Sequence, residues 1–200
     1  MISAFLIPGF NQYRSFDHSD FDVLRETMLQ HDISVAGMVD AWQDYGIREY
    51  GQLANAQIEQ LQTVDVIIGH SLGAIAALAS IEDAGVDNLF LCSPSALFAE
   101  DADMLKRPET ISFIGRKRVD ELSQIDTEQT ANKVSSLGIY TTITYGSNEK
   151  ILNPALVHRA HALSDKMVSS QILEINGAGH SIRDGVYART IARLIEKSVR

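Results

Sequence analysis

A serine lies between two glycines in the segment Gly69-His70-Ser71-Leu72-Gly73. An apolar run, 64–68, precedes this segment and a stretch rich in alanine and leucine, 74–81, follows it, so it joins a predicted strand to a predicted helix. A serine at such a turn is held in a tight backbone conformation with its hydroxyl exposed. The flanking glycines matter because a Cβ at either position would crowd the turn. Ser71 is therefore a candidate nucleophile, and a serine N-cap in a glycine-rich turn is the structural alternative.

A serine hydroxyl is a weak nucleophile at neutral pH and needs an adjacent base, which is most often histidine. Of the six histidines, His180 follows the last predicted strand in the segment Gly177-Ala178-Gly179-His180-Ser181, where two glycines let the loop approach another loop closely. His70 lies inside the serine turn and is expected to pack or cap there. His158 and His161 lie three residues apart on one predicted helix, where an exposed helix face is favoured over a metal site. We therefore predict His180 as the base and no bound metal.

The base in turn needs a group that fixes its tautomer and stabilises the imidazolium. The turn Gly146-Ser147-Asn148-Glu149-Lys150 follows a predicted strand, and carboxylates at strand ends can reach the same edge of a parallel sheet as Ser71 and His180. Glu149 is the predicted acid, with an exposed loop carboxylate paired with Lys150 as the alternative. The other carboxylates considered are Asp120, Asp126 and Asp184, the last of which is more typical of a helix N-cap.

The anion formed on an attacked carbonyl needs fixed N–H donors. One should be the backbone N–H of Leu72, at the start of a helix whose dipole favours negative charge. The second should come from the loop after the first strand, where Gly9 lets the backbone approach and Phe10 supplies the N–H; a simple Pro-Gly turn is the alternative. Five residues could wall an apolar acyl pocket, although side chains at such places are as often plain core: Phe10, Trp42, Tyr45, Leu97 and Phe98.

The elements that must position these residues alternate along the chain. Apolar runs predict strands at 2–7, 33–39, 64–68, 86–92, 139–145 and 171–175, with a seventh considered at 111–114. Helical patterns cover 20–30, 53–61, 72–83, 120–137 (as one or two helices), 154–166 and 185–199, and 40–49 is predicted as a loop. This order implies right-handed crossovers and an α/β fold with a mostly parallel sheet of six or seven strands, covered by helices on both faces.

Composition is that of a soluble globular protein, with 45% apolar and 22% charged residues, and 200 residues suggest one domain, 1–200, with 97–135 as a small cap or insertion. A net charge of −9 without an extended basic stripe argues against a nucleic-acid partner, and the one basic triplet, 116–118, is interpreted as a solvated face. No apolar run approaches membrane-spanning length, and the N-terminus has the pattern of a strand rather than a signal peptide. The single cysteine, Cys92, fits a reducing compartment, so we expect a cytoplasmic protein; the oligomeric state is left open.

Together these residues resemble the α/β-hydrolase family over nearly the whole chain. Ser71, Glu149 and His180 keep the family's order of serine, acid and histidine, and the segments 69–73 and 177–181 are similar to its nucleophile elbow and histidine loop. The stretch from Asp40 to Gly46 resembles an Asp…Gly-Tyr-Gly loop of the family. The chain departs from the family in carrying Pro8-Gly9 where many members have His-Gly, and in starting at what resembles the family's third strand, as a minimal member with a reduced cap.

The resemblance implies hydrolysis of a small-molecule carboxylic ester or thioester through an acyl-enzyme on Ser71, without a cofactor. Because a fold does not settle a reaction, other chemistry on the same fold remains an alternative: C–C bond hydrolysis, perhydrolysis or lyase chemistry. A protein that binds a small molecule without turning it over is a further alternative. A complete Ser-His-acid set argues against the binding protein, which has no need of His180.

Overall fold

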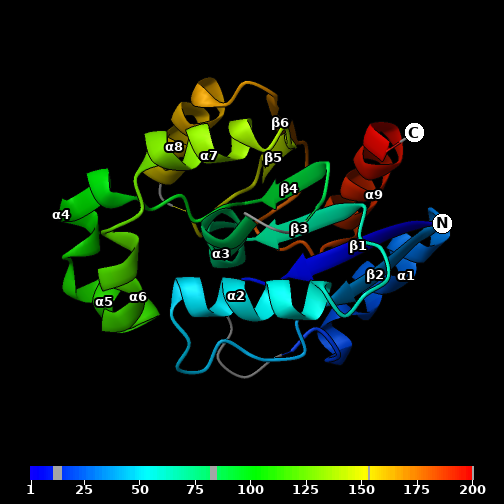
Figure 1. Ribbon diagram of the computed structural model, residues 1–200, viewed down its shortest axis with the longest axis horizontal. Helices are drawn as coiled ribbons and strands as arrows, with labels where there is room; N and C mark the ends of the chain where they lie inside the picture. The colour runs from blue at the N-terminus through cyan, green and yellow to red at the C-terminus, as the bar shows by residue number, and fades with distance from the viewer. Residues whose placement is uncertain (11–14, 82–84, 153, 200) are drawn as a thin grey trace.

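Six parallel strands form the sheet of the computed structural model, which describes residues 1–10, 15–81, 85–152 and 154–199 (Figure 1). The strands are β1 (Ile2–Ile7), β2 (Ile33–Gly37), β3 (Val66–His70), β4 (Asn88–Cys92), β5 (Tyr140–Gly146) and β6 (Ser170–Ile175). Their order across the sheet is β2-β1-β3-β4-β5-β6, and every neighbouring pair is parallel. All strands therefore end at one edge, where the turns that carry Ser71, Glu149 and His180 gather.

Helices cover both faces of the sheet, as the predicted βα alternation requires (Figure 1). On one face lie α1 (Asp22–Gln30) and α9 (Gly185–Val199), packed with inward residues such as Leu6 and Ile68. On the other lie α2 (Ile47–Ile58), α3 (Leu72–Ser80), α7 (Thr127–Ser136) and α8 (Pro154–Lys166), packed with alternating residues such as Phe5 and Ile67. The inner strands β1, β3 and β4 are mostly buried on both faces, which explains why their sequences are nearly continuous apolar runs.

The segment between β4 and α7 folds over the carboxyl ends of the strands. It contains a 3₁₀ turn, Ala99–Asp101, and three short helices, α4 (Ala102–Leu105), α5 (Pro108–Ile114) and α6 (Arg116–Leu122). In Figure 1 the arrowheads of the strands point toward the side of the molecule where α4, α5 and α6 lie. We call residues 99–122 the cap, since they lie within the 97–135 stretch for which the sequence predicted one.

Most predicted elements match, and two of the departures have local causes. Residues 111–114 are helical, in α5, so the seventh strand is wrong; Pro108 at the start of the helix and Gly115 after it delimit one short helix. The helix α2 begins at Ile47, inside the predicted loop, where the N–H of Gly46 donates to Glu49 Oε2 at 3.0 Å and caps the helix. Gly51 lets the helix pack closely, since a Cβ there would lie 2.6 Å from the carbonyl oxygen of Ala76 in α3. The predicted end of the helix over 72–83 lies outside the described residues. Among the described residues, no helix is long and apolar enough to cross a membrane.

Candidate active site

Ser71 occupies a sharp turn between β3 and α3. Its backbone has φ 53° and ψ −121°, a conformation that non-glycine residues seldom adopt and that is held when the surroundings fix it. Here the Ser71 N–H donates to the carbonyl of Cys92 at 2.9 Å, and the Ser71 carbonyl accepts from the N–H of Ser95 at 3.2 Å. A Cβ on Gly73 would lie 2.3 Å from the carbonyl oxygen of Ile7, so this glycine lets the turn pack against the end of β1.

The side chains of His180 and Glu149 are joined by a hydrogen bond. His180 Nδ1 lies 2.8 Å from Glu149 Oε2, and the side chains are 11% and 8% exposed. The other carboxylate oxygen of Glu149 accepts from the N–H groups of Ile151 at 2.8 Å and Leu152 at 3.0 Å. Burial raises the pKa of Glu149, but the hydrogen bonds from Leu152, His180 and Ile151 outweigh it, so the net pKa lies below its usual value. An ionised Glu149 that accepts from Nδ1–H leaves Nε2 of His180 able to take a proton.

The loops that carry Glu149 and His180 pack against each other. The N–H of Asn148 donates to the carbonyl of Ala178 at 2.9 Å, and the N–H of Gly177 donates to Ser147 Oγ at 2.9 Å. Gly146 ends β5 at their closest approach, where a Cβ would lie 2.2 Å from the carbonyl oxygen of Ala178. The pairing of Glu149 with His180 is thus set by the backbone, not only by the two side chains.

A cavity of about 530 Å³ contains both Ser71 and His180 in its wall. Ser71 Oγ lies 3.1 Å from Ser95 Oγ, which also lines the cavity. Most of the remaining wall is apolar and comes from the cap and from the start of α8, with Arg107 and Glu109 as its charged members. The wall residues other than the two serines and His180 are Phe10, Leu72, Leu97, Met104, Arg107, Glu109, Thr110, Phe113, Ile114, Ile151, Leu152 and Leu156.

His70 is hydrogen-bonded to the backbone of the loop that carries His180. Its Nε2–H donates to the carbonyl oxygen of His180 at 3.0 Å, and the two rings lie 5.1 Å apart. Burial lowers the pKa of His70 to about 3, and the charges of His180 and Arg183 add to this effect. His70 is therefore neutral at physiological pH, with its proton on Nε2, in keeping with the packing role predicted for it.

The comparisons with known proteins bear on the fold. No family model and no curated protein matches the sequence. Among solved structures, Est1E from Butyrivibrio proteoclasticus with bound ferulic acid is 19% identical, with a TM-score of 0.69 over 100% of this chain and 86% of that chain. The esterase domain of a Rhodothermus marinus protein is 13% identical, with a TM-score of 0.71 over 98% and 85%. MGS-MChE2, an α/β-hydrolase enzyme from a sediment metagenome of the Mar Chica lagoon in Morocco, is 12% identical, with a TM-score of 0.68 over 98% and 90%.

The chain has the α/β-hydrolase fold. At these identities the likeness establishes the fold alone, and the all-parallel pairing of six strands agrees with the mostly parallel sheet that the sequence predicted. Within this fold the predicted serine, histidine and acid lie after β3, β6 and β5 respectively.

The two predicted oxyanion donors also lie at the cavity of this α/β-hydrolase fold. Leu72 is the first residue of α3, so its N–H has no carbonyl partner earlier in the helix. Phe10 lines the cavity, and Gly9 beside it lies against the serine turn: a Cβ on Gly9 would be 2.9 Å from Ser71 Cβ. Both positions are compatible with donation toward a carbonyl held at Ser71.

The predicted pocket wall needs correction at three of its five positions. Phe10 and Leu97 line the cavity, but Trp42 and Phe98 are fully buried in the core, and Tyr45 lies at a separate surface hollow with Glu49, Gln52 and Leu53. Trp42 stacks on Tyr50 at 3.9 Å and donates from Nε1 to the carbonyl of Pro8 at 3.0 Å. These aromatic rings therefore support the site instead of facing it.

The other carboxylates that were considered as partners of His180 lie elsewhere in the fold. Asp126 caps α7 by accepting from the N–H of Gln129 at 2.8 Å, and Asp184 accepts from the N–H of Val186 at 2.8 Å at the start of α9. Asp120 lies on the exposed face of α6. Sequence reasoning missed Ser95 and the cap residues of the wall; the turn Ser93-Pro94-Ser95 after β4 was the available signal for the first, since it ends a strand at the same edge.

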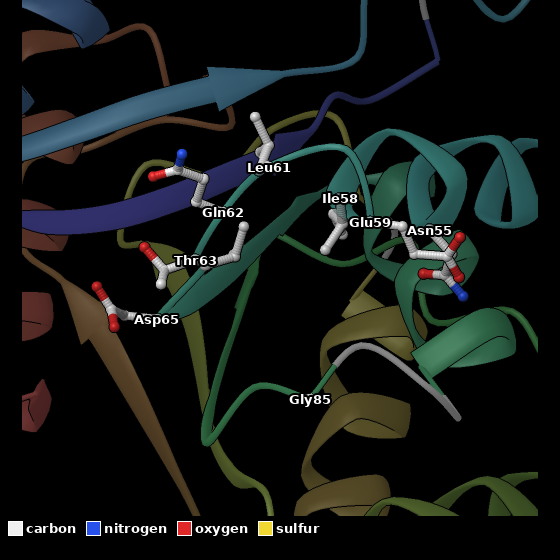
Figure 2. Close-up of a pocket in the computed structure, with 9 residues that line it drawn as sticks. Asn55, Ile58, Glu59, Leu61, Gln62, Thr63, Asp65 and Gly85 are labelled. Carbon is white, nitrogen blue, oxygen red and sulfur yellow. The ribbon is translucent and has the colours of Figure 1, made fainter.

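Another cavity, of about 460 Å³, lies at the other end of the strands, where β3 begins (Figure 2). Its lining includes Asp65, directly before β3, whereas Ser71 follows β3, so the length of the strand separates the two cavities. Asp65 is engaged structurally, since its carboxylate accepts from the N–H of Ser3 at 2.7 Å. Among the described residues, no group of three histidines, cysteines or carboxylates could hold a metal ion.

Proposed function

We propose that this protein is a serine hydrolase that cleaves a small-molecule carboxylic ester or thioester through an acyl-enzyme on Ser71. The observation that carries the proposal is the cavity shared by Ser71 and His180, with His180 held by Glu149 at 2.8 Å. A strained serine, an oriented imidazole and a buried carboxylate in this chain order form a nucleophile, a base and its orienting group.

The proposed reaction has two halves. His180 Nε2 takes the proton of Ser71 Oγ as that oxygen attacks the carbonyl carbon, and the N–H groups of Leu72 and Phe10 donate to the oxyanion. Attack requires the hydroxyl to exchange its bond with Ser95 for one with His180, a change that substrate binding can bring about. His180 then protonates the leaving group, and water, activated by the same imidazole, releases the acid from Ser71.

The cavity wall supports a substrate with an apolar acyl or aryl group. Leu97, Met104, Phe113 and Leu156 supply most of the surface that such a group would meet, and the volume suits a small molecule. The bound ferulic acid of the neighbour Est1E is a small aromatic acid of this kind. We therefore expect medium-chain or aromatic esters to be cleaved faster than acetyl esters.

Covalent labelling tests the nucleophile. A fluorophosphonate probe should label Ser71, as peptide mapping would show, and Ser71→Ala should lose labelling and about 10⁴- to 10⁶-fold in kcat with nitrophenyl esters. Ser136→Ala, an exposed hydroxyl on α7, is the control and should leave both unchanged. Undiminished esterase activity in Ser71→Ala would overturn the proposal.

A substrate panel separates the alternatives. It should contain nitrophenyl esters of increasing chain length, acyl-CoA thioesters and β-diketones. Turnover of the diketones alone would indicate C–C bond hydrolysis on the same fold, and tight binding without product release would indicate a binding protein.

A further inference from the structure

Arg118 is a buried cation in the cap, next to the site but outside its wall. The basic triplet 116–118 was expected to be solvated, and the structure corrects this for Arg118, which is 6% exposed. A buried guanidinium is costly unless its N–H groups find acceptors. The groups that contact the Arg118 guanidinium therefore indicate which segments this side chain holds together.

Its contacts join the cap to two loops below it. Nη1 donates to the carbonyl of Ile114 at 2.8 Å, and Nη2 donates to the carbonyls of Trp42, at 3.2 Å, and Gln43. The guanidinium carbon lies 4.6 Å from the ring centre of Phe10 and 5.6 Å from that of Trp42, which are cation–π distances. One planar cation thus binds backbone from two segments and both aromatic rings.

The rings of Phe10 and Trp42 hold the turn Pro8-Gly9-Phe10 in place. Trp42 donates from Nε1 to the carbonyl of Pro8 at 3.0 Å, and the ring of Phe10 meets that of Trp42 edge-on at 6.1 Å. Gly9, between them, lies against Ser71. Any shift of either ring would move the backbone that faces the nucleophile.

We propose that Arg118 is a positioning residue that fixes the turn 8–10, through Phe10 and Trp42, so that the N–H of Phe10 stays aimed at the oxyanion. This inference rests on the proposed function, because it assigns Arg118 a part in the same reaction. A lysine could not replace it, since one ammonium cannot stack on the rings and donate to three carbonyls in a planar fork.

Lys117 provides a matched control on the same helix. Its Nζ donates to the carbonyl of Asp44 at 3.3 Å and pairs with Glu49 at 2.6 Å, so it also ties the cap to the loop before α2, from the surface. It is not among the cations that stack on Phe10 or Trp42 in the described structure. If cap anchoring alone mattered, Lys117→Met would resemble a change at Arg118.

The test compares Arg118→Lys with Lys117→Met, with kcat expressed per site titrated by the fluorophosphonate. Arg118→Lys should lose roughly 10- to 100-fold in kcat per titrated site, because a donor displaced by a fraction of an ångström stabilises the oxyanion poorly. KM should stay within about threefold, since the donor acts mainly in the transition state. The affinity for an alkyl boronic acid, which forms a tetrahedral adduct on serine, should fall with kcat, and Lys117→Met should change none of these quantities.

A double-mutant cycle tests the route through Phe10. Phe10→Leu removes the ring but keeps the N–H, so the losses in kcat of Phe10→Leu and Arg118→Lys should be far less than multiplicative in the double variant. If Arg118→Lys does not fold, Trp42→Phe, which removes the bond to Pro8 but keeps an aromatic ring beside Phe10 and Tyr50, should show the same selective loss in kcat.

The outcomes separate this inference from the proposed function. The positioning role alone would be overturned if the wild-type protein is labelled and turns over esters while Arg118→Lys keeps the full kcat per titrated site. Equal losses of kcat in Arg118→Lys and Lys117→Met would also overturn it. A wild-type protein that neither labels nor turns over esters would overturn the proposed function, and this inference with it.

Discussion

Glu149 is held as an anion by donors from three groups. Two are backbone N–H groups of the turn that follows it, and the third is His180. A carboxylate with this many donors keeps its charge despite burial, so it can both fix the Nδ1–H tautomer of His180 and stabilise the imidazolium.

Replacing this carboxylate by an amide should cost activity with little change in shape. We expect Glu149→Gln to lower kcat about 10²- to 10⁴-fold with nitrophenyl esters, because an amide can hold the wrong imidazole tautomer and cannot stabilise its cation. Steady-state kinetics with active-site titration measures this. Glu128→Gln, an exposed carboxylate paired with Lys166 on another element, should retain full activity. Full activity in Glu149→Gln would remove Glu149 from the proposed triad.

The free energy of unfolding of Glu149→Gln should also depend on pH differently from that of the wild type. The pKa of Glu149 is lower in the folded chain than its ordinary value of 4.5, so its charge stabilises the fold above pH 4.5 and this contribution fades as the pH falls through the folded-state pKa. The difference in free energy of unfolding between wild type and Glu149→Gln should therefore be constant from pH 7 to 5 and shrink below pH 4.5. Urea titrations across this range measure it, and a difference independent of pH would contradict the assignment.

At the scale of elements, glycines decide how closely the turns of the proposed site approach one another. Gly146 ends β5 where a Cβ would lie 2.2 Å from the carbonyl oxygen of Ala178 and 2.4 Å from that of Gly179. Neither neighbour is a flexible side chain, so the loop of His180 would have to move.

Gly146→Ala should therefore separate the acid loop from the base loop. We expect a fall of roughly 10- to 100-fold in kcat, because a displacement of about 1 Å is enough for such a loss. Gly185→Ala is the matched control, since its Cβ would meet only the flexible end of Arg189 at 3.1 Å. Equal activity of the two variants would show that the loop contact at Gly146 is not required.

Strands and helices could be predicted from the sequence where a local pattern distinguishes one from the other. Apolar runs bounded by turns located all six strands, and Pro154 with the 3.6-residue pattern after it located α8. The run 111–114 failed because four apolar residues fit a strand and a short helix equally, and only the flanking Pro108 and Gly115 separate the two. The turns of Ser71, Glu149 and His180 could be found because each follows a strand, where parallel topology brings side chains together.

The cavity wall could not be predicted in the same way. Trp42 and Phe98 have the composition of pocket residues, yet both are buried beneath the site, while Met104 and Phe113 face the cavity from the cap. Which side of a cap helix faces the sheet depends on tertiary packing, and this information is spread over many residues. Arg118 shows the same effect, because its burial depends on carbonyls and rings that are distant in sequence.

At the scale of the whole molecule, the site is a junction of layers. Ser71 lies in the turn between β3 and α3, Glu149 and His180 lie in the turns after β5 and β6, and the cap supplies part of the cavity wall. His70 lies at this junction, where it joins the strand of the nucleophile to the loop of the base through the carbonyl of His180. A change in its charge therefore bears on the stability of the entire fold.

The free energy of unfolding should fall on acidification partly through His70. Its pKa is about 3 in the folded chain and 6.5 ordinarily, so between these values the unfolded chain binds a proton that the folded chain refuses. At pH 4.5 this costs roughly 2 to 3 kcal/mol relative to pH 7. His70→Gln keeps an N–H donor for the carbonyl of His180 but has no such proton, so its stability should fall less between pH 7 and 4.5 in urea titrations. His161→Gln, on the exposed side of α8, should keep the wild-type dependence, and an equal loss in His70→Gln and wild type would show that His70 is protonated in the folded chain.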